Sequence, residues 1–167
     1  KPLRFEDSDW GEKHRSLIGQ TCDYLNPGWE KRFQVAPPPS NGSAQTKAEV
    51  VELLKLQASR TPLEQREIDI EKSDSAFKML NTAGVESLDE KPLTAALITR
   101  LNRDATIVVM TFKDRFRRVR PAVLDSRIKP SVETPSHPAY PSAHATLCRV
   151  MAHVLSDLNL SKKDRLF

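Results

Sequence analysis

The stretch PLTAALITRLNRDATIVVMTFKDRFRRVRP, residues 92–121, predicts a long amphipathic helix. At about 100° per residue, large apolar side chains fall on one stripe of this helix, and their neighbours widen it. The stripe comprises Leu97, Leu101, Val108 and Phe112, widened by Ile98, Ala105 and Phe116. We expect the helix to run from about Pro92 and to be ended by Pro121, because a residue that precedes a proline is disfavoured in the α region.

Helical patterns also stand on both sides of this stretch. Ser43 is an expected N-cap for a helix over 44–60, and Thr61 caps a second helix that begins at Pro62 and that Gly84 is expected to terminate. The last helix is expected from about Ser142 to Leu158. Its buried stripe comprises Leu147, Val150, Met151, Val154, Leu155 and Leu158. Alternating β patterns are scarce and aromatic residues make up only 6%, so the chain is predicted to be all-α.

The chain divides at a proline-rich break. Residues 1–35 are polar with scattered aromatic residues and predict an irregular N-terminal arm with a short helix near 11–20. The break itself, APPPSNGSA, covers 36–44. The 167 residues suffice for one domain with a core, so we expect one helical domain over 36–167.

The net charge and the composition limit the kinds of partner that we expect. A net charge of +4 suits an anionic substrate but falls far short of a nucleic-acid-binding tail, so no nucleic acid is expected; the same charge also fits a protein with no anionic partner. No apolar run approaches the roughly 20 residues of a membrane span. Cys22 and Cys148 are compatible either with one disulfide or with two unrelated thiols, and no zinc-type cluster or other metal site is expected.

A basic cluster, KDRFRRVRP, covers residues 113–121. Lys113 and Arg120 are seven residues apart, so on a continuous helix they would project from nearly the same side, at the edge of the apolar stripe. Arg118 would then point to solvent. An arginine fork and a lysine point charge suit a shared oxyanion. The alternative is a basic helix C-terminus that complements the helix dipole.

The stretch HPAYPSAHATL, residues 137–147, predicts a helix start at Ser142. The free N–H groups of a first turn form a natural anion site. His144 lies in that turn, is expected to face inward with Leu147 and Met151, and is a candidate proton donor; the alternative is a core-edge histidine. His137 either lines a cleft or has no role, His153 is expected at the surface, and nothing in its surroundings assigns a role to His14.

Together the two motifs resemble part of a known superfamily. They resemble two of the three signature motifs of the type-2 phosphatidic-acid phosphatase superfamily. The first consists of Lys113, six further residues and Arg120–Pro121, and the second is Pro141–Ser142–Ala143–His144. That superfamily includes bacterial class A acid phosphatases and vanadium-dependent haloperoxidases. YPSAHA is close to the YPSGHA or YPSGHT of the soluble bacterial acid phosphatases, and the resemblance covers the chain from about residue 36.

The resemblance implies an all-α bundle of the acid phosphatase/haloperoxidase type that hydrolyses phosphomonoesters without a metal or other cofactor, in the periplasm or outside the cell. It implies that Lys113 and Arg120 bind the phosphoryl oxygens, together with Ser142 and the N–H of Ala143. His144 would be the general acid. Ala143 stands where the family has glycine, which implies a slightly tighter pocket.

The third motif of the family, an arginine, five residues, a histidine, three residues and an aspartate, supplies the nucleophilic histidine and has no match here. We expect it, with the C-terminal helices of the bundle, beyond residue 167, or else in a second chain or an oligomer. The 167 residues alone are then expected to bind inorganic phosphate or a small phosphorylated substrate and to turn over little.

Two alternatives stay open at this stage. The same residue set holds vanadate in haloperoxidases, so the motifs do not separate a phosphatase, which vanadate binds as a phosphate analogue, from a relative with vanadate as its cofactor. A non-catalytic helical module that binds anionic partners is the third possibility.

Overall fold

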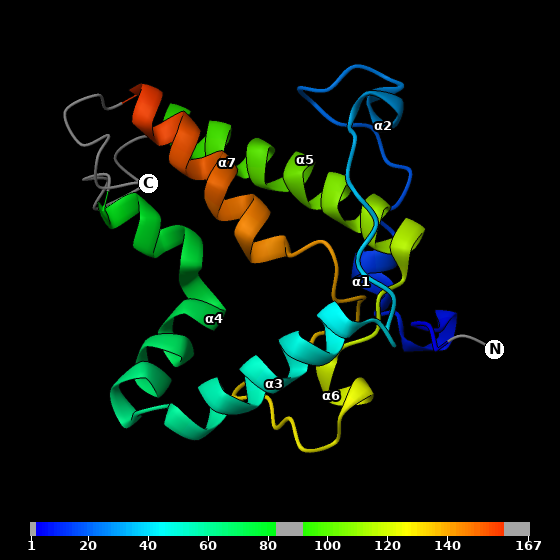
Figure 1. Cartoon of the computed structure of the whole chain (residues 1–167). Helices are drawn as coiled ribbons and strands as arrows, with labels where there is room; N and C mark the ends of the chain where they lie inside the picture. The colour runs from blue at the N-terminus through cyan, green and yellow to red at the C-terminus, as the bar shows by residue number, and fades with distance from the viewer. Residues whose placement is uncertain (1–2, 83–91, 159–167) are drawn as a thin grey trace.

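The computed structural model describes residues 3–82 and 92–158, and side chains of 73–82 and of Leu158 are excluded from the description (Figure 1). This part of the chain contains helices and loops but no strand, so the all-α prediction is confirmed. Gly84 lies outside the described residues. The elements are a 3-10 helix, η1 (Asp7–Asp9), and the α-helices α1 (Glu12–Arg15), α2 (Trp29–Arg32), α3 (Ala44–Ser59), α4 (Pro62–Thr82), α5 (Pro92–Phe116), α6 (Pro121–Leu124) and α7 (Ala143–Leu158).

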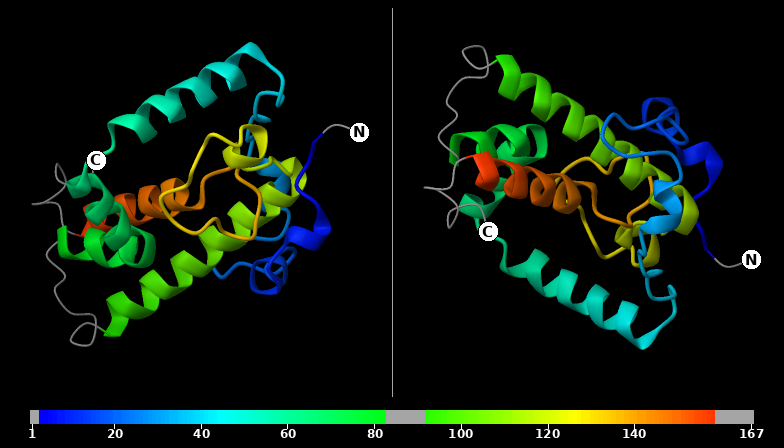
Figure 2. Two further views of the ribbon diagram at one scale, coloured as in Figure 1. Left: turned by 90° about the horizontal axis from the view of Figure 1, so that it is seen from below. Right: turned by 90° about the horizontal axis from the view of Figure 1, so that it is seen from above.

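The centre of the fold is the pair α5 and α7, which lie side by side, while α4 contacts α7 (Figure 1). Both views in Figure 2 show α3 at the edge of the molecule, apart from α5. Several apolar side chains of α3 are accordingly exposed, among them Val51, Leu53 and Leu56. No helix in the described ranges is both long enough and apolar enough to cross a bilayer.

Local capping chemistry sets the starts of α3 and α4. The hydroxyl of Ser43 accepts the N–H of Thr46 at 3.1 Å. The hydroxyl of Thr61 accepts the N–H of Glu64 at 3.2 Å, and the carboxylate of Glu64 accepts the N–H of Thr61 at 2.7 Å. This reciprocal pair is a capping box, and both predicted helix starts are confirmed.

The buried side of α5 is wider than the predicted stripe. Leu97, Leu101 and Val108 are only half-buried, whereas Ile107, Val109 and Met110 are buried with Phe112. The cause is the N-terminal arm, whose Trp10 packs on Val109 and Met110 and whose Trp29 packs on Ile107 and Phe112. The arm therefore completes the core, although its predicted helix is limited to the four residues of α1.

The predicted end of α5 is wrong. The helix stops at Phe116, because Arg117 adopts a left-handed conformation with φ of 49°, and Pro121 instead begins α6. Long-range contacts support this costly conformation. The Arg117 guanidinium pairs with Asp7 and Asp114, and its carbonyl accepts the N–H of Phe5 at 3.0 Å. Lys113 and Arg120 therefore do not share one helix.

Arg118 also differs from its prediction. Its guanidinium does not point to solvent but donates to the carbonyl of Pro39, to Oδ1 of Asn41 at 2.7 Å and to the hydroxyl of Thr46 at 2.9 Å. The arginine thereby fastens the proline-rich break and the first turn of α3 to the loop after α5.

Candidate functional site

The first predicted motif meets the segment that precedes the second, because residues 117–120 and 137–139 run side by side. The N–H of Ala139 donates to the carbonyl of Arg118 at 2.8 Å. The guanidinium of Arg120 donates to the carbonyl of His137 from Nε at 3.0 Å and from Nη2 at 2.8 Å. Nη2 also lies 3.4 Å from the carbonyl oxygen of Pro135.

Lys113 reaches the same segment from the last turn of α5. Its side chain is 1% exposed, and Nζ donates to the carbonyl of Pro138 at 2.5 Å. The successive carbonyls of His137 and Pro138 thus hold Arg120 and Lys113. The predicted pair is brought together, but by this loop rather than by helical periodicity.

The charge of this pair is not neutralised by the described residues. Arg117 pairs with two aspartates and Arg127 with one, whereas no carboxylate in the described ranges forms an ion pair with Lys113 or Arg120. Burial lowers the pKa of Lys113 to about 7, and the charge of Arg120 lowers it further in the same direction. Burial also lowers the pKa of Arg120. Two partly desolvated cations without an acid favour a bound anion.

The start of α7 follows in the same segment. The hydroxyl of Ser142 accepts the N–H of Ala145 at 3.2 Å, and its carbonyl accepts the N–H of Thr146 at 3.2 Å, so the predicted N-cap is confirmed. Within the described part of the chain, no acceptor meets the N–H groups of Ala143 and His144. These groups lie at the positive end of the helix dipole.

His144 is exposed, so its predicted inward orientation is wrong. Ala143 is the residue of this turn that packs against the Trp10 cluster, and the next residue lies about 100° further round the helix. The stripe shared with His144 becomes buried only deeper in α7, at Met151 and Leu155. His153 is exposed as predicted.

The two halves of the predicted site are joined by the chain itself. No described contact links Ser142, Ala143 or His144 directly to Lys113 or Arg120. Ser142 follows Pro138, whose carbonyl holds Lys113, by four positions, which limits the Cα–Cα distance between these two residues to roughly 14 Å. The Tyr140–Pro141 peptide within this segment is cis.

Two histidines that the sequence left without a role lie at this site. His137 is 7% exposed, and its Nδ1 lies 2.9 Å from Nη2 of Arg120. The ring of His14, from α1, meets it edge-on with centroids 4.9 Å apart. Burial lowers the pKa of His137 to about 4. The carbonyl of Pro138 acts against this shift, whereas Lys113, Arg120 and His14 act in the same direction as burial. Burial also lowers the pKa of His14, with Lys13 and Lys113 contributing.

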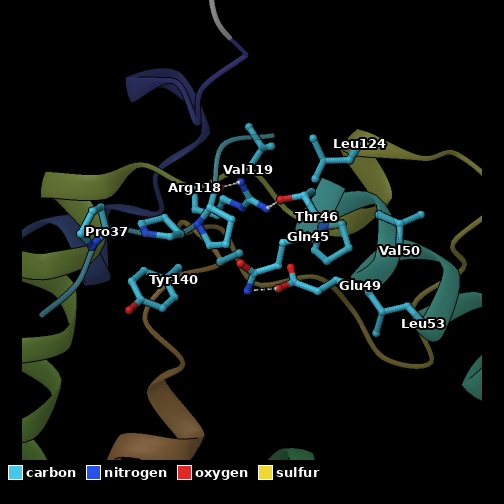
Figure 3. Close-up of a pocket in the computed structure, with 14 residues that line it drawn as sticks. Pro37, Gln45, Thr46, Glu49, Val50, Leu53, Arg118, Val119, Leu124 and Tyr140 are labelled. Carbon is cyan, nitrogen blue, oxygen red and sulfur yellow. Dashed lines mark hydrogen bonds between the residues drawn. The ribbon is translucent and has the colours of Figure 1, made fainter. Parts of the chain in front are cut away.

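Two cavities lie near this region. Figure 3 shows a cleft of about 440 Å³ between the proline-rich break, α3 and the loops that carry Arg118 and Tyr140. None of the five predicted phosphate-site residues lines it. A smaller pocket of about 220 Å³ has Arg120 in its wall, between mainly apolar side chains such as Ile128 and Val132.

The remaining predicted features concern metals and thiols. Among the described residues, no group of three histidine, cysteine or acidic side chains is arranged to hold a metal ion. Cys22 and Cys148 are both free thiols.

Comparison of the chain with models of known protein families gives no match, and comparison with curated proteins gives none either. Its functional interpretation therefore depends on the chemistry of the site.

Proposed function

We propose that this protein is a phosphoric monoester hydrolase of the acid phosphatase type, with the corresponding helical bundle, and that it binds a phosphoryl group between Lys113, Arg120 and the start of α7. One observation carries the proposal. Two neighbouring cations that have no carboxylate partner among the described residues are held by consecutive carbonyls, in a segment that leads directly into a helix N-terminus.

Each side chain has a role in this proposal. The guanidinium of Arg120 and the ammonium group of Lys113 neutralise the phosphoryl oxygens, whose charge is spread over all of them in the transition state. Ser142 and the free N–H groups of Ala143 and His144 add hydrogen bonds at the helix end. His144, exposed in the first turn, donates a proton to the leaving oxygen. The nucleophilic histidine comes from the third motif, which the described residues do not contain.

Phosphate binding tests the proposal directly. We expect isothermal titration of the chain with inorganic phosphate to show that Arg120→Ala weakens binding about 100-fold, because charge-assisted hydrogen bonds are lost. The matched control is Arg115→Ala, which removes an exposed arginine of the same basic cluster and should change the affinity less than about threefold. Equal phosphate binding by the wild type and Arg120→Ala, or no binding by the wild type, would refute the proposal.

Activity assays then distinguish a phosphatase, a haloperoxidase and a non-catalytic module. The protein with its third motif in place is expected to hydrolyse p-nitrophenyl phosphate. Oxidation of bromide by peroxide after addition of vanadate, without phosphatase activity, would replace the hydrolase by a haloperoxidase. Phosphate binding without either activity in the full-length protein would identify a non-catalytic anion-binding module.

A further inference from the structure

The ring of His137 has a defined hydrogen-bonding role toward Arg120. An arginine N–H can only donate, so Nδ1 of His137 must be the acceptor in its 2.9 Å contact with Nη2. The ring proton of the neutral imidazole is thereby assigned to Nε2. The carbonyl of Pro138, 3.2 Å from Nδ1, already accepts from Lys113.

The same residue accounts for most of the donors of Arg120. The carbonyl of His137 accepts from Nε and Nη2, and its ring accepts from Nη2. The remaining nitrogen, Nη1, has no acceptor among the residues that the structure describes. One edge of the guanidinium is therefore fixed by residue 137, and Nη1 is left for a ligand.

We propose that His137 is a positioning residue that, as a neutral imidazole packed against His14, fixes the guanidinium of Arg120 for binding an oxyanion. This inference rests on the proposed function, because it concerns the same anion site. His137 acts through Arg120 and does not itself touch the anion.

Protonation of His137 would dismantle this arrangement. A protonated ring donates from Nδ1, so it repels Nη2 of Arg120 and turns to the carbonyl of Pro138, where it competes with Lys113. The charged or titratable groups that face the ring are Lys113 from α5, Arg120 from the following loop and His14 from α1, and all are basic. This surrounding charge, with burial, keeps the ring neutral until the pH falls toward the His137 pKa of about 4.

Three variants, studied by titration with sulfate at pH 6, test the role. Sulfate keeps its double charge from pH 4 upward, so its own titration does not complicate the comparison. His137→Leu removes the acceptor and should weaken sulfate binding about tenfold. His137→Asn places an amide oxygen near the position of Nδ1 and should stay within about threefold of wild type. His153→Asn, on the exposed side of α7, is the matched control and should bind as the wild type does.

Two further measurements distinguish positioning from a merely structural contribution. In an Arg120→Gln background, His137→Leu should cause no additional loss, because the group that it positions is absent. As the pH falls from 6 to 4, wild-type affinity should drop relative to that of His137→Asn, since only the wild-type ring gains a proton. Circular dichroism at each pH reports whether the fold persists, and the asparagine variant decides the question where the leucine variant does not fold.

The outcomes separate this inference from the proposed function. If His137→Leu binds sulfate as tightly as the wild type while Arg120→Ala does not, the inference is wrong and the proposed function stands. It is also wrong if His137→Asn is as weak as His137→Leu, or if the loss persists in the Arg120→Gln background. If the wild type binds neither sulfate nor phosphate, both are wrong.

Discussion

The basic cluster at the end of α5, residues 113–121, contains two pairs of cations whose partners differ. Arg117 pairs with two aspartates, and Arg118 donates to three oxygens of the break and of α3. Lys113 and Arg120 lie on either side of them in sequence, and their partners within the described ranges are carbonyls and an imidazole. The first pair forms what we call the anchor, and the second pair belongs to the proposed binding site, which we call the anion site.

The difference shows that basic side chains in one short stretch have separate roles. Which role each has depends on the hydrogen-bond acceptors and carboxylates that distant segments place beside it. The anchor is satisfied within the protein, since Arg117 pairs with two carboxylates and Arg118 donates to three neutral oxygen atoms. The anion site retains positive charge that a ligand would balance. Variants of the two regions should therefore affect stability and affinity in opposite proportions.

Lys113→Met is expected to have the largest effect on affinity. Loss of the buried ammonium should weaken sulfate or phosphate binding about 100-fold, while the folded state gains roughly 1–4 kcal/mol because a desolvated charge is replaced by an apolar chain of similar length. Titration calorimetry and urea unfolding measure the two quantities. A variant that loses stability and keeps its affinity would place Lys113 in the anchor instead.

Arg118→Met should show the reverse pattern. The carbonyl of Pro39 and the hydroxyl of Thr46 lose their donor, so we expect a loss of about 2 kcal/mol in the free energy of unfolding. Sulfate affinity should change less than about threefold. Urea unfolding and calorimetry again provide the test, and a loss of affinity as large as that of Arg120→Ala would abolish the distinction between the regions.

The pH dependence of sulfate binding should show the titration of Lys113. Its pKa in the folded protein, about 7, lies below the usual value, and a bound anion favours the protonated form. Lys113 is therefore mostly protonated at pH 6 and half protonated near pH 7, and affinity should decrease about fivefold between pH 7 and pH 8, as the lysine loses its remaining proton. Calorimetry in two buffers of different ionisation enthalpy should detect proton uptake on binding, and Lys113→Met should show none. Constant wild-type affinity over this range would mean that Lys113 does not contact the anion.

Ser43→Ala should have the smallest effect, and it should lower stability without changing affinity. The N-cap of α3 is lost, which costs about 1 kcal/mol, and thermal unfolding should show the decrease. Phosphate affinity should be unchanged. A measurable change in affinity would mean that α3 contributes to the anion site.

Sequence reasoning succeeded where a feature depends on neighbouring residues. The caps at Ser43, Thr61 and Ser142 each involve residues within four positions, and all three were predictable. The end of α5 was not, because the left-handed Arg117 depends on Asp7 and Phe5, far away in the chain. The width of the buried face of α5 likewise depends on the two tryptophans of the arm.

At the anion site, too, features set by neighbouring residues were predictable and features set by distant residues were not. Lys113 and Arg120 were identified from their spacing, but the assumed geometry was wrong, since a loop and not a helix brings them together. The contact of His137 with His14 joins residues 123 positions apart, and no local pattern indicates it. The exposure of His144 follows from the packing of Ala143 against the Trp10 cluster, a tertiary contact that a helical wheel does not contain.

The packing of the arm also bears on how this protein can be shortened for production. The composition suggests a version that starts at the proline-rich break, because residues 1–35 are predicted to be an irregular arm outside the helical domain. It would lose Trp10 and Trp29, leave the apolar side of α5 open to water and uncover the ring of His137. Such a surface promotes self-association and poor recovery. A workable shortened protein should begin no later than Phe5, whose backbone secures the turn at Arg117.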